Sequence, residues 1–353
     1  MRCIECKCRS IGWDKKNPLD SWCTGVKHPF KIENIYAECT EYFDGDQYTT
    51  PTWGSIRFEA DTYTKPTLTV LVGLPGSGKS TFAKQRIEDN PRAVWLSSDA
   101  IRERLYGDPG CQKDPHKVFD IMQEEAITAL NNGFDVIYDA TSVTRKSRRG
   151  ILEKVPKHVR KECVIVWAPL DICIARDEDR ERTVGFEVIN KMLRRFEAPF
   201  YDEGFDSIKV YLSAVYMNLD QYYVELISAM NIDHDNPHHS ANVLEHCYLC
   251  GTGLLGKQVP DVVVTAGFLH DIGKPYTKTF KNRKGEDVDI AHYYDHQAVG
   301  AYLSYGIKGH NPTLAWLIST HMAPFINQKY YESLPACYKK WIDALHKADR
   351  SAH

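Results

Sequence analysis

The sequence predicts an α/β domain with a parallel sheet, followed by an all-α domain. From Thr67 onward, short apolar segments alternate with amphipathic stretches of helical spacing. A glycine-rich loop separates the first apolar segment from the helix that follows it, and beyond Asn236-Pro237 most segments have helical spacing. Alternation of strands and helices is typical of a parallel sheet covered by helices on both faces.

The elements of the α/β domain follow in order. The first strand, Leu68–Val72, leads into the glycine-rich loop, and a helix begins at Lys79. Pro115–Asn131 has apolar residues at helical spacing and stops at Asn132-Gly133. The remaining strands are expected at Ala93–Leu96, Asp135–Tyr138, Cys163–Trp167 and Ile208–Tyr211.

The last third of the chain predicts mostly helices. We expect a helix at Leu219–Met230, and then helices at about 238–250, 259–271, 295–305, 312–321 and 334–350, with a hairpin turn at Lys281–Gly285. The domains are accordingly a small N-terminal Cys- and aromatic-rich module (1–65), the α/β domain (66–215), a linker (216–235) and the helical domain (236–353).

Length and composition are those of ordinary globular protein. The chain has 353 residues, of which 43% are hydrophobic, and its length fits two or three domains of roughly 100–200 residues each. A formal net charge of -3 gives no general basic field for nucleic acid. No apolar stretch approaches the roughly 18 residues of a membrane span, and the N-terminus lacks a signal-peptide core. We therefore expect a cytoplasmic protein without a membrane partner, whose cysteines are thiols or metal ligands.

The segment Gly73–Ser80 is a complete G-x-x-x-x-G-K-[ST] loop. Its glycines let backbone N–H groups approach phosphates, and the following helix adds a positive dipole. Lys79 would reach the terminal phosphates, and Ser80 would hold Mg²⁺. We expect ATP or another NTP, bound by Gly73, Gly76, Ser77, Gly78, Lys79, Ser80 and Thr81.

Polar residues follow two further strands at the edge where ligands of such sheets bind. Asp99 can accept the proton of an attacking hydroxyl, and Arg102 can clamp a substrate phosphate. Asp139 and Thr141 end the third strand at the same edge and are further candidate substrate-binding residues. The alternative for Asp99 is a helix cap or a first-turn residue, a role that carboxylates favour in any helix.

Two arginines, Arg176 and Arg180, lie four residues apart and so would share a helical face. Such a pair fits a lid that stabilises charge on a transferred phosphoryl group. Arg182 could take the place of Arg180, and both Arg176 and Arg180 could instead be ordinary surface partners of nearby carboxylates. A basic run between Ser142 and Glu162 likewise suits either nucleic-acid contact or a solvated helix face.

With these motifs, residues 67–215 resemble the P-loop polynucleotide kinases that repair RNA and DNA ends. The likeness covers the phosphate loop, Asp99-x-x-Arg102, Asp139-Ala140-Thr141 and the Arg176/Arg180 lid. It implies that Lys79 is catalytic, that Asp99 is the general base for a 5′-hydroxyl, and that Arg102 contacts the adjacent phosphate.

The helical domain carries a set of candidate metal ligands. Histidines and carboxylates on facing helices can hold one or two metals for phosphoester hydrolysis. His246, His270, Asp271 and Asp349 would form one site, and His296 and His321 would permit a second metal. Around them, residues 236–353 resemble the HD phosphohydrolase superfamily, which implies divalent Mn, Ni, Co or Fe and a substrate-phosphate contact from Lys274. Cys247 and Cys250, by contrast, are interpreted as core thiols.

The N-terminal module could hold structural Zn²⁺ through Cys3, Cys6, Cys23 and Cys39. The alternative is a small β-rich module with scattered thiols.

The combination predicts a bifunctional end-healing enzyme. Its kinase would phosphorylate 5′-hydroxyl ends of RNA or DNA, tRNA among them, and its HD domain would remove a 3′-phosphate or open a 2′,3′-cyclic phosphate. A separate RNA ligase is the implied partner, and the oligomeric state stays open. Two alternatives remain: a nucleoside or nucleotide kinase coupled to an HD nucleotidase, and a nucleotide-gated RNA-binding regulator. Proteins that resemble this combination place the HD module first, whereas here it comes last.

Overall fold

The computed structural model describes residues 65–214, 218–237, 241–309 and 311–352, and the backbone of three short strands before them. The chain forms two compact units, Met1–Tyr63 and Thr64–His353. In the first unit, β1 (Ile11–Gly12), β2 (Trp22–Cys23) and β3 (Phe30–Lys31) form an antiparallel sheet. The candidate zinc ligands Cys3, Cys6 and Cys39, and the side chain of Cys23, lie outside the described residues.

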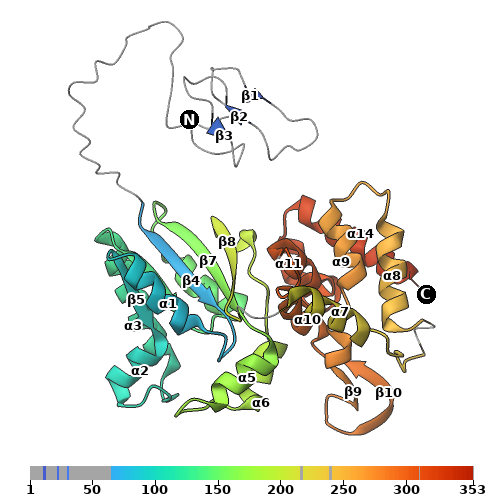
Figure 1. The fold of residues 1–353 in the computed structure, drawn as a ribbon, viewed down its shortest axis with the longest axis horizontal. Coiled ribbons are helices and arrows are strands. Elements are labelled where there is room, and N and C mark those ends of the chain that lie inside the picture. Colours follow the sequence, from blue (N-terminus) through green and yellow to red (C-terminus); the bar gives the residue numbers. More distant parts are fainter. Residues whose placement is uncertain are drawn as a thin grey trace, which may run out of the picture. The chain divides into compact units, whose positions relative to one another are not determined.

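The second unit begins with the predicted parallel sheet. Its five strands run in the order β5-β6-β4-β7-β8, and all neighbours are parallel (Figure 1). The strands are β4 (Thr67–Val72), β5 (Ala93–Ser97), β6 (Asp135–Asp139), β7 (Arg160–Trp167) and β8 (Ser207–Leu212). The first strand, β4, lies at the centre between β6 and β7, so the loop that follows it emerges where the strand order reverses, which is the usual ligand crevice of such sheets.

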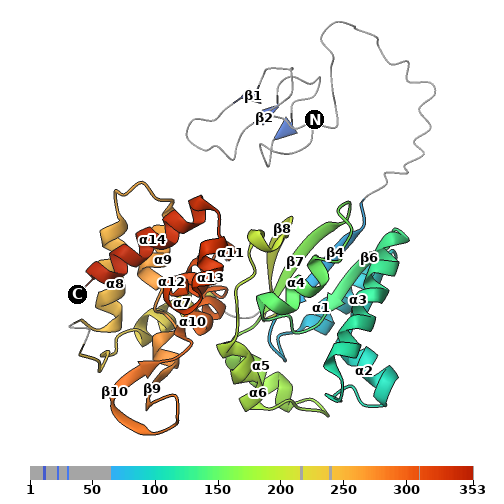
Figure 2. The same cartoon turned by 180° about the vertical axis from the view of Figure 1, so that it is seen from behind.

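Helices cover both faces of the sheet, as continuous apolar strands require. On one face, α1 (Lys79–Asp89) packs Phe82 and Ala83 against Leu71 and Val166. On the other face lie α3 (Pro115–Asn131) and α4 (Arg145–Leu152) (Figure 2). The shorter helices of this domain are α2 (Ser98–Tyr106), α5 (Leu170–Glu178) and α6 (Phe186–Arg194).

The rest of the unit is helical apart from one hairpin, β9 (Lys278–Lys281) and β10 (Asp287–Tyr293). Its helices are α7 (Leu219–Ala229), α8 (Val243–Leu254), α9 (Asp261–Leu269), α10 (His296–Ser304), α11 (Pro312–Thr320), α12 (Ala323–Ile326), α13 (Gln328–Ser333) and α14 (Ala336–Ser351). The helix expected from residue 238 begins only at Val243, because Asn242 and Glu245 form a capping box there. Helices α12 and α13 were not expected from the sequence.

The α/β and helical domains share one core. The indole of Trp167 in β7 donates to the carbonyl of Tyr302 in α10 at 2.8 Å, and the Tyr302 hydroxyl donates to the carbonyl of Ala168 at 2.7 Å. Nearby, Phe200 stacks on Trp316 of α11 with ring centroids 4.1 Å apart. A Cβ on Gly306 would lie 2.3 Å from the Trp167 ring, so this contact needs glycine. The domains therefore pack as parts of a single body.

Among the described residues, none of the helices has the length and apolar character that crossing a membrane requires.

Candidate active sites

The glycine-rich loop after β4 is shaped by two glycines with positive φ. Gly76 has a φ of +78° and Gly78 a φ of +96°, a region that other residues rarely adopt. A Cβ on Gly73 would lie 2.4 Å from the Val166 carbonyl oxygen, which explains the glycine there as well. The hydroxyl of Ser77 is buried without a hydrogen-bond partner in the described part of the chain. The loop thus has the backbone curvature that a phosphate cradle needs.

Lys79 and Ser80 begin α1 directly behind this loop. The Lys79 ammonium donates to the carbonyls of Gly73 and Leu74 at 3.0 and 2.9 Å, and burial lowers its pKa. The Ser80 hydroxyl donates to Asp139 Oδ2 at 3.1 Å, and the indole of Trp95 donates to the same oxygen. A P-loop hydroxyl beside a strand-end Asp is a typical Mg²⁺ pair. Asp139 thus lies beside the hydroxyl predicted to hold Mg²⁺, a contact that the sequence did not indicate.

Two further candidates are Thr81, from the predicted nucleotide site, and Thr141, a predicted substrate-binding residue. Thr81 is exposed in the first turn of α1. Thr141 contributes its backbone, since its carbonyl accepts from the N–H of Gly73 at 3.3 Å.

Asp99 and Arg102 form an ion pair on α2. Arg102 Nη1 lies 2.7 Å from Asp99 Oδ1; the Asp99 side chain is 66% exposed and the Arg102 side chain 10%. The helix cap is Ser97, whose hydroxyl accepts from the Asp99 N–H, so Asp99 is a first-turn residue and does not cap the helix. Arg102 Nε is buried without a hydrogen-bond partner within the described ranges. Arg102 thus holds one carboxylate oxygen of an exposed acid, which leaves the second oxygen to act as a base.

The two predicted lid arginines do not share a helix. Helix α5 ends at Glu178, because the Asp177 carboxylate accepts from the N–H groups of Val184 and Gly185 and draws the chain back. Arg176 points at the phosphate loop, with Nη1 2.9 Å from Ser213 Oγ and 3.4 Å from the Gly76 carbonyl. Arg180 lies beyond the helix end. Arg182, the third arginine, packs on the backbone of Gly110.

Part of the basic run is used inside the fold. Arg148 is fully buried and makes a bidentate contact with Glu203 at 2.8 and 2.7 Å. Arg145 binds Asp202 at 2.5 Å. Arg149 pairs with Glu153 one turn away. Arg145 and Arg148 are therefore held by ion pairs inside the fold, whereas Lys146, Lys157 and Arg160 are exposed.

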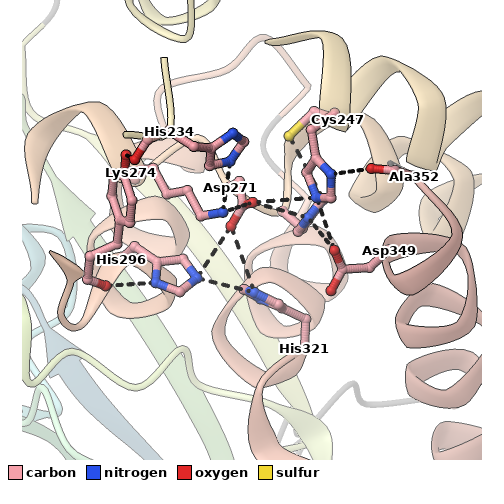
Figure 3. Close-up of polar contacts among 12 residues, drawn as sticks. His234, Cys247, Asp271, Lys274, His296, His321, Asp349 and Ala352 are labelled. Atoms are coloured by element: carbon pink, nitrogen blue, oxygen red, sulfur yellow. Dashed lines mark hydrogen bonds and ion pairs between the residues drawn. The ribbon is translucent and has the colours of Figure 1, made fainter. Parts of the chain in front are cut away.

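Six predicted metal ligands converge in the helical domain (Figure 3). All four histidine Nδ1 atoms lie 2.7–3.0 Å from backbone carbonyls, to which they donate in the neutral ring. The acceptors are the carbonyls of Ala352, Gly267, Tyr293 and Ile318. These hydrogen bonds fix the tautomer and turn each Nε2 lone pair inward, as in histidines that bind metals.

Asp271 stands at the centre of these nitrogens. Its Oδ2 lies 3.3 Å from His270 Nε2 and 3.7 Å from His246 Nε2, while its Oδ1 lies 3.2 Å from His296 Nε2 and 4.0 Å from His321 Nε2. Asp349 Oδ1 adds a further oxygen, 2.9 Å from His246 Nε2. The donors form two groups, His246–His270–Asp271 and Asp271–His296–His321, that have Asp271 in common.

These donors fit divalent transition metals. His270 Nε2 is buried and has no hydrogen-bond partner in the described structure, and such an orphan atom needs a ligand. Burial would raise the pKa of Asp271, yet the Lys274 ammonium beside it holds that pKa well below its usual value, so the carboxylate stays ionised. Burial and the neighbouring histidines lower the pKa of His321 to about 3, which keeps that imidazole neutral. Neutral imidazoles and an ionised carboxylate are the ligands that such metals take.

Lys274, the predicted phosphate contact, faces the same centre. Its ammonium lies 2.6 Å from Asp271 Oδ2 and 3.1 Å from His234 Nε2. His234 is buried, and burial together with Lys274 lowers its pKa to about 4, so its ring is neutral and accepts from Lys274. His234 lies in an irregular segment, where sequence periodicity gives no signal for a site residue.

The two cysteines of α8 are buried, in accord with the interpretation as core thiols. Cys247 is also in contact with the metal centre, since its Sγ lies 3.8 Å from His270 Nδ1.

Comparison with known proteins identifies both domains. Residues 68–199 match the AAA domain family, and residues 238–348 match the HD domain family. The chain therefore carries a P-loop kinase domain followed by an HD domain.

Curated relatives match the kinase part. An L-seryl-tRNA(Sec) kinase of Methanococcus maripaludis is 31% identical over 144 residues, which cover 37% of this chain and 53% of that protein. Transcription factor bHLH140 of Arabidopsis thaliana is 28% identical over 153 residues, which cover 41% of this chain and 16% of that protein. The chain thus spans about half the length of the first relative and a small part of the second.

Among solved structures, the Pnkp1/Rnl/Hen1 RNA repair complex has a chain 26% identical to this one. The match covers 38% of this chain and 44% of that chain, with a TM-score of 0.34. A fungal RNA kinase is 14% identical, with 58% of this chain and 96% of that chain covered and a TM-score of 0.33.

Proposed function

We propose that the chain heals broken nucleic-acid ends, with a kinase for 5′-hydroxyl ends and an HD phosphohydrolase for 3′-phosphate or 2′,3′-cyclic phosphate ends. The observation that carries the proposal is the presence, in one compact unit, of a P-loop beside the Asp99–Arg102 ion pair and of a buried cluster of histidines and carboxylates that could hold metal ions. One chemistry adds a phosphate and the other removes one, which is what a ligase needs at the two sides of a break.

At the kinase site, the chain's own groups would prepare a hydroxyl for transfer. Asp99 accepts the hydroxyl proton at the oxygen that Arg102 leaves open. Lys79, released from the Gly73 and Leu74 carbonyls, turns to the phosphates of the NTP, and Arg176 stabilises charge at the mouth of the loop. Ser80 and Asp139 would hold Mg²⁺, which supplies charge neutralisation on the phosphates.

At the HD site, the four histidines, Asp271 and Asp349 would hold one or two divalent ions. Such ions polarise a phosphoryl oxygen and acidify water. Lys274 brings a cation to within 2.6 Å of Asp271 and would bind a substrate oxygen there. The His234 ring orients the Lys274 ammonium from the other side. A site with buried nitrogen donors and a single lysine suits the terminal phosphate of a nucleic-acid strand, which is small and highly charged.

The test is an RNA with 5′-hydroxyl and 2′,3′-cyclic phosphate ends, incubated with labelled ATP and with Mg²⁺, Mn²⁺, Ni²⁺ or Co²⁺. We expect label at the 5′ end and conversion of the 3′ end, resolved on a denaturing gel. Matched DNA and free nucleosides serve as the other acceptors. Phosphorylation of nucleosides with none of oligonucleotides would refute the proposal and favour the small-molecule enzyme.

A second acceptor has a specific basis. The relative with 31% identity is an L-seryl-tRNA(Sec) kinase, so an aminoacyl group on tRNA is a second candidate acceptor for this chain. Seryl-tRNA in the same assay, with tRNA lacking the amino acid as control, distinguishes this acceptor from a 5′-hydroxyl end. Label that depends on the serine would assign the kinase to the aminoacyl group.

A further inference from the structure

A cavity of about 380 Å³ lies between the kinase domain and the HD domain, apart from both sites described above. Its walls come from α4 and α6 on the kinase side and from α10 to α13 on the HD side. Four basic residues and one acidic residue line it: Arg145, Lys146, Arg194, Arg195 and Glu197. Its volume falls within the range of small-ligand sites, roughly 300–1,000 Å³.

Two of the four cations, Arg145 and Arg194, already contact other residues of the protein. Arg145 binds Asp202 at 2.5 Å and donates to the Tyr330 hydroxyl at 3.0 Å, and its guanidinium lies over the Tyr330 ring. Arg194 donates to the Tyr294 carbonyl at 3.0 Å. These contacts join the kinase helices to the HD domain across the cavity and fix its shape. The Glu197 carboxylate accepts from the Arg145 backbone N–H at 2.6 Å, so part of its charge is already satisfied.

The other two cations, Lys146 and Arg195, are exposed. Neither has an ion pair or a side-chain hydrogen bond among the residues that the structure describes. Two unpaired cations at the wall of a concave site attract an anion, and the guanidinium of Arg195 suits a phosphate in particular.

The position of the cavity relates it to the metal centre. Gln297 and Thr320 contribute to its HD-side wall, and each is the sequence neighbour of a metal-site histidine, His296 and His321. Consecutive Cα atoms are about 3.8 Å apart, so the cavity lies beside the chain segments that carry His296 and His321. A strand whose end reaches these histidines has phosphates within reach of the cavity, because successive phosphates follow at intervals of several ångströms.

We propose that this cavity binds the phosphodiester backbone of the strand whose 3′ end enters the HD centre, with Lys146 and Arg195 as its phosphate contacts. The proposal rests on the end-healing function, because it assumes that the substrate is a nucleic-acid strand. It names a binding site that involves both domains, with cations from the kinase side serving the reaction on the HD side.

The test compares Lys146→Gln/Arg195→Gln with Lys157→Gln/Lys191→Gln. The control pair is also exposed and basic, and it lies next to α4 and on α6 but outside the cavity. Binding of a fluorescent 3′-phosphate RNA oligonucleotide is measured from 0.05 to 0.5 M salt. Loss of two single-strand phosphate contacts lowers the slope of log K against log salt by about 1.4 and weakens binding at 0.1 M by roughly 25-fold. Hydrolysis of p-nitrophenyl phosphate, which has no strand to bind, should stay at the wild-type rate.

The outcomes separate the two proposals. If the wild-type protein processes both RNA ends and the cavity variant keeps the wild-type slope of log K against log salt, the cavity proposal alone is overturned. An equal loss in the control pair also overturns it, since the effect would then be general charge. A loss of affinity for a 3′-mononucleotide, without a change for the oligonucleotide, shows a nucleotide pocket and not a strand site. Wild-type protein that neither binds nor processes the oligonucleotide refutes the end-healing function itself.

Discussion

The phosphate loop and the HD centre lie in the same body and are built by opposite structural means. The loop is built from consecutive residues and mostly from backbone, and its acceptor acid Asp99 has a side chain that is 66% exposed. The HD centre is built from side chains that are spread over about a hundred residues, and its four histidines and Asp271 are all buried. The difference teaches that a nucleotide, which must bind and leave in each cycle, needs an open site. A metal ion that stays bound needs a preformed, buried set of donor atoms.

Asp271→Ala should have the largest effect. Both carboxylate oxygens face histidine pairs, so its removal empties both halves of the centre at once. Because loss of an outer partner already costs about 10–100-fold in metal affinity or activity, we expect a loss beyond about 100-fold here. Phosphohydrolase rate and bound metal, measured by mass spectrometry after dialysis, check this. Asp289→Ala, an exposed carboxylate on β10, is the control. If Asp271→Ala also loses kinase activity, the two sites do not act independently.

Asp99→Ala tests the kinase site. Removal of a general base costs about 10²–10⁴-fold, so 5′-phosphorylation should fall by that factor while nucleotide binding and 3′-end processing persist. Rates with labelled ATP and binding of a fluorescent ATP analogue separate the two effects. Glu103→Ala, a carboxylate on the same helix, is the matched control. Wild-type kinase activity in Asp99→Ala would show that the acceptor base lies elsewhere.

His321→Ala tests whether the HD centre holds one metal ion or two. His321 belongs to the Asp271–His296–His321 group and not to the His246–His270–Asp271 group. We expect the variant to keep one bound ion and to lose a second, with phosphohydrolase activity reduced by about 10–100-fold. Metal analysis of purified protein after reloading with Mn²⁺ or Ni²⁺ measures this. A single ion in both wild type and variant would mean that the second group holds no metal.

Gly306→Ala tests whether the two regions form one body. The added Cβ would lie 2.3 Å from the Trp167 ring and 2.4 Å from the Tyr222 ring. Such overpacking costs about 1–3 kcal/mol of the free energy of unfolding. Gly253→Ala, in a helix with open space around it, should instead be neutral or stabilising by up to about 1 kcal/mol. The midpoints of denaturant unfolding compare the variants with the wild type. An unchanged midpoint for Gly306→Ala would show that the contact between the two domains is not tightly packed.

The phosphate loop shows how far the sequence could be interpreted. Gly73 to Ser80 is contiguous, and its conformation depends on local φ angles and on the strand before it, so its nucleotide role was predictable. The end of α5 was not predictable, because it depends on two hydrogen bonds that Asp177 receives from residues seven and eight positions later. The Arg176/Arg180 pair was therefore placed on a helix that stops before Arg180.

The HD centre was predictable in its members but not in its surroundings. The motif residues could be named one by one, whereas His234 could not, because only the fold brings its ring to Lys274, forty residues away. The same holds for the basic run: Arg145 and Arg148 are neutralised by carboxylates 57 and 55 residues away. Charge in a sequence cannot show which charges are already paired.

By itself, the sequence determined the strands, most of the helices, the nucleotide loop and the identities of the candidate metal donors, because each depends on short-range periodicity or on residue chemistry. The tertiary structure alone decided three things: Asp139 faces Ser80, Asp271 lies between two histidine pairs, and the two domains share the Trp167–Tyr302 core. The physical reason is that hydrogen bonds and packing between distant segments are fixed only when the chain has closed around them.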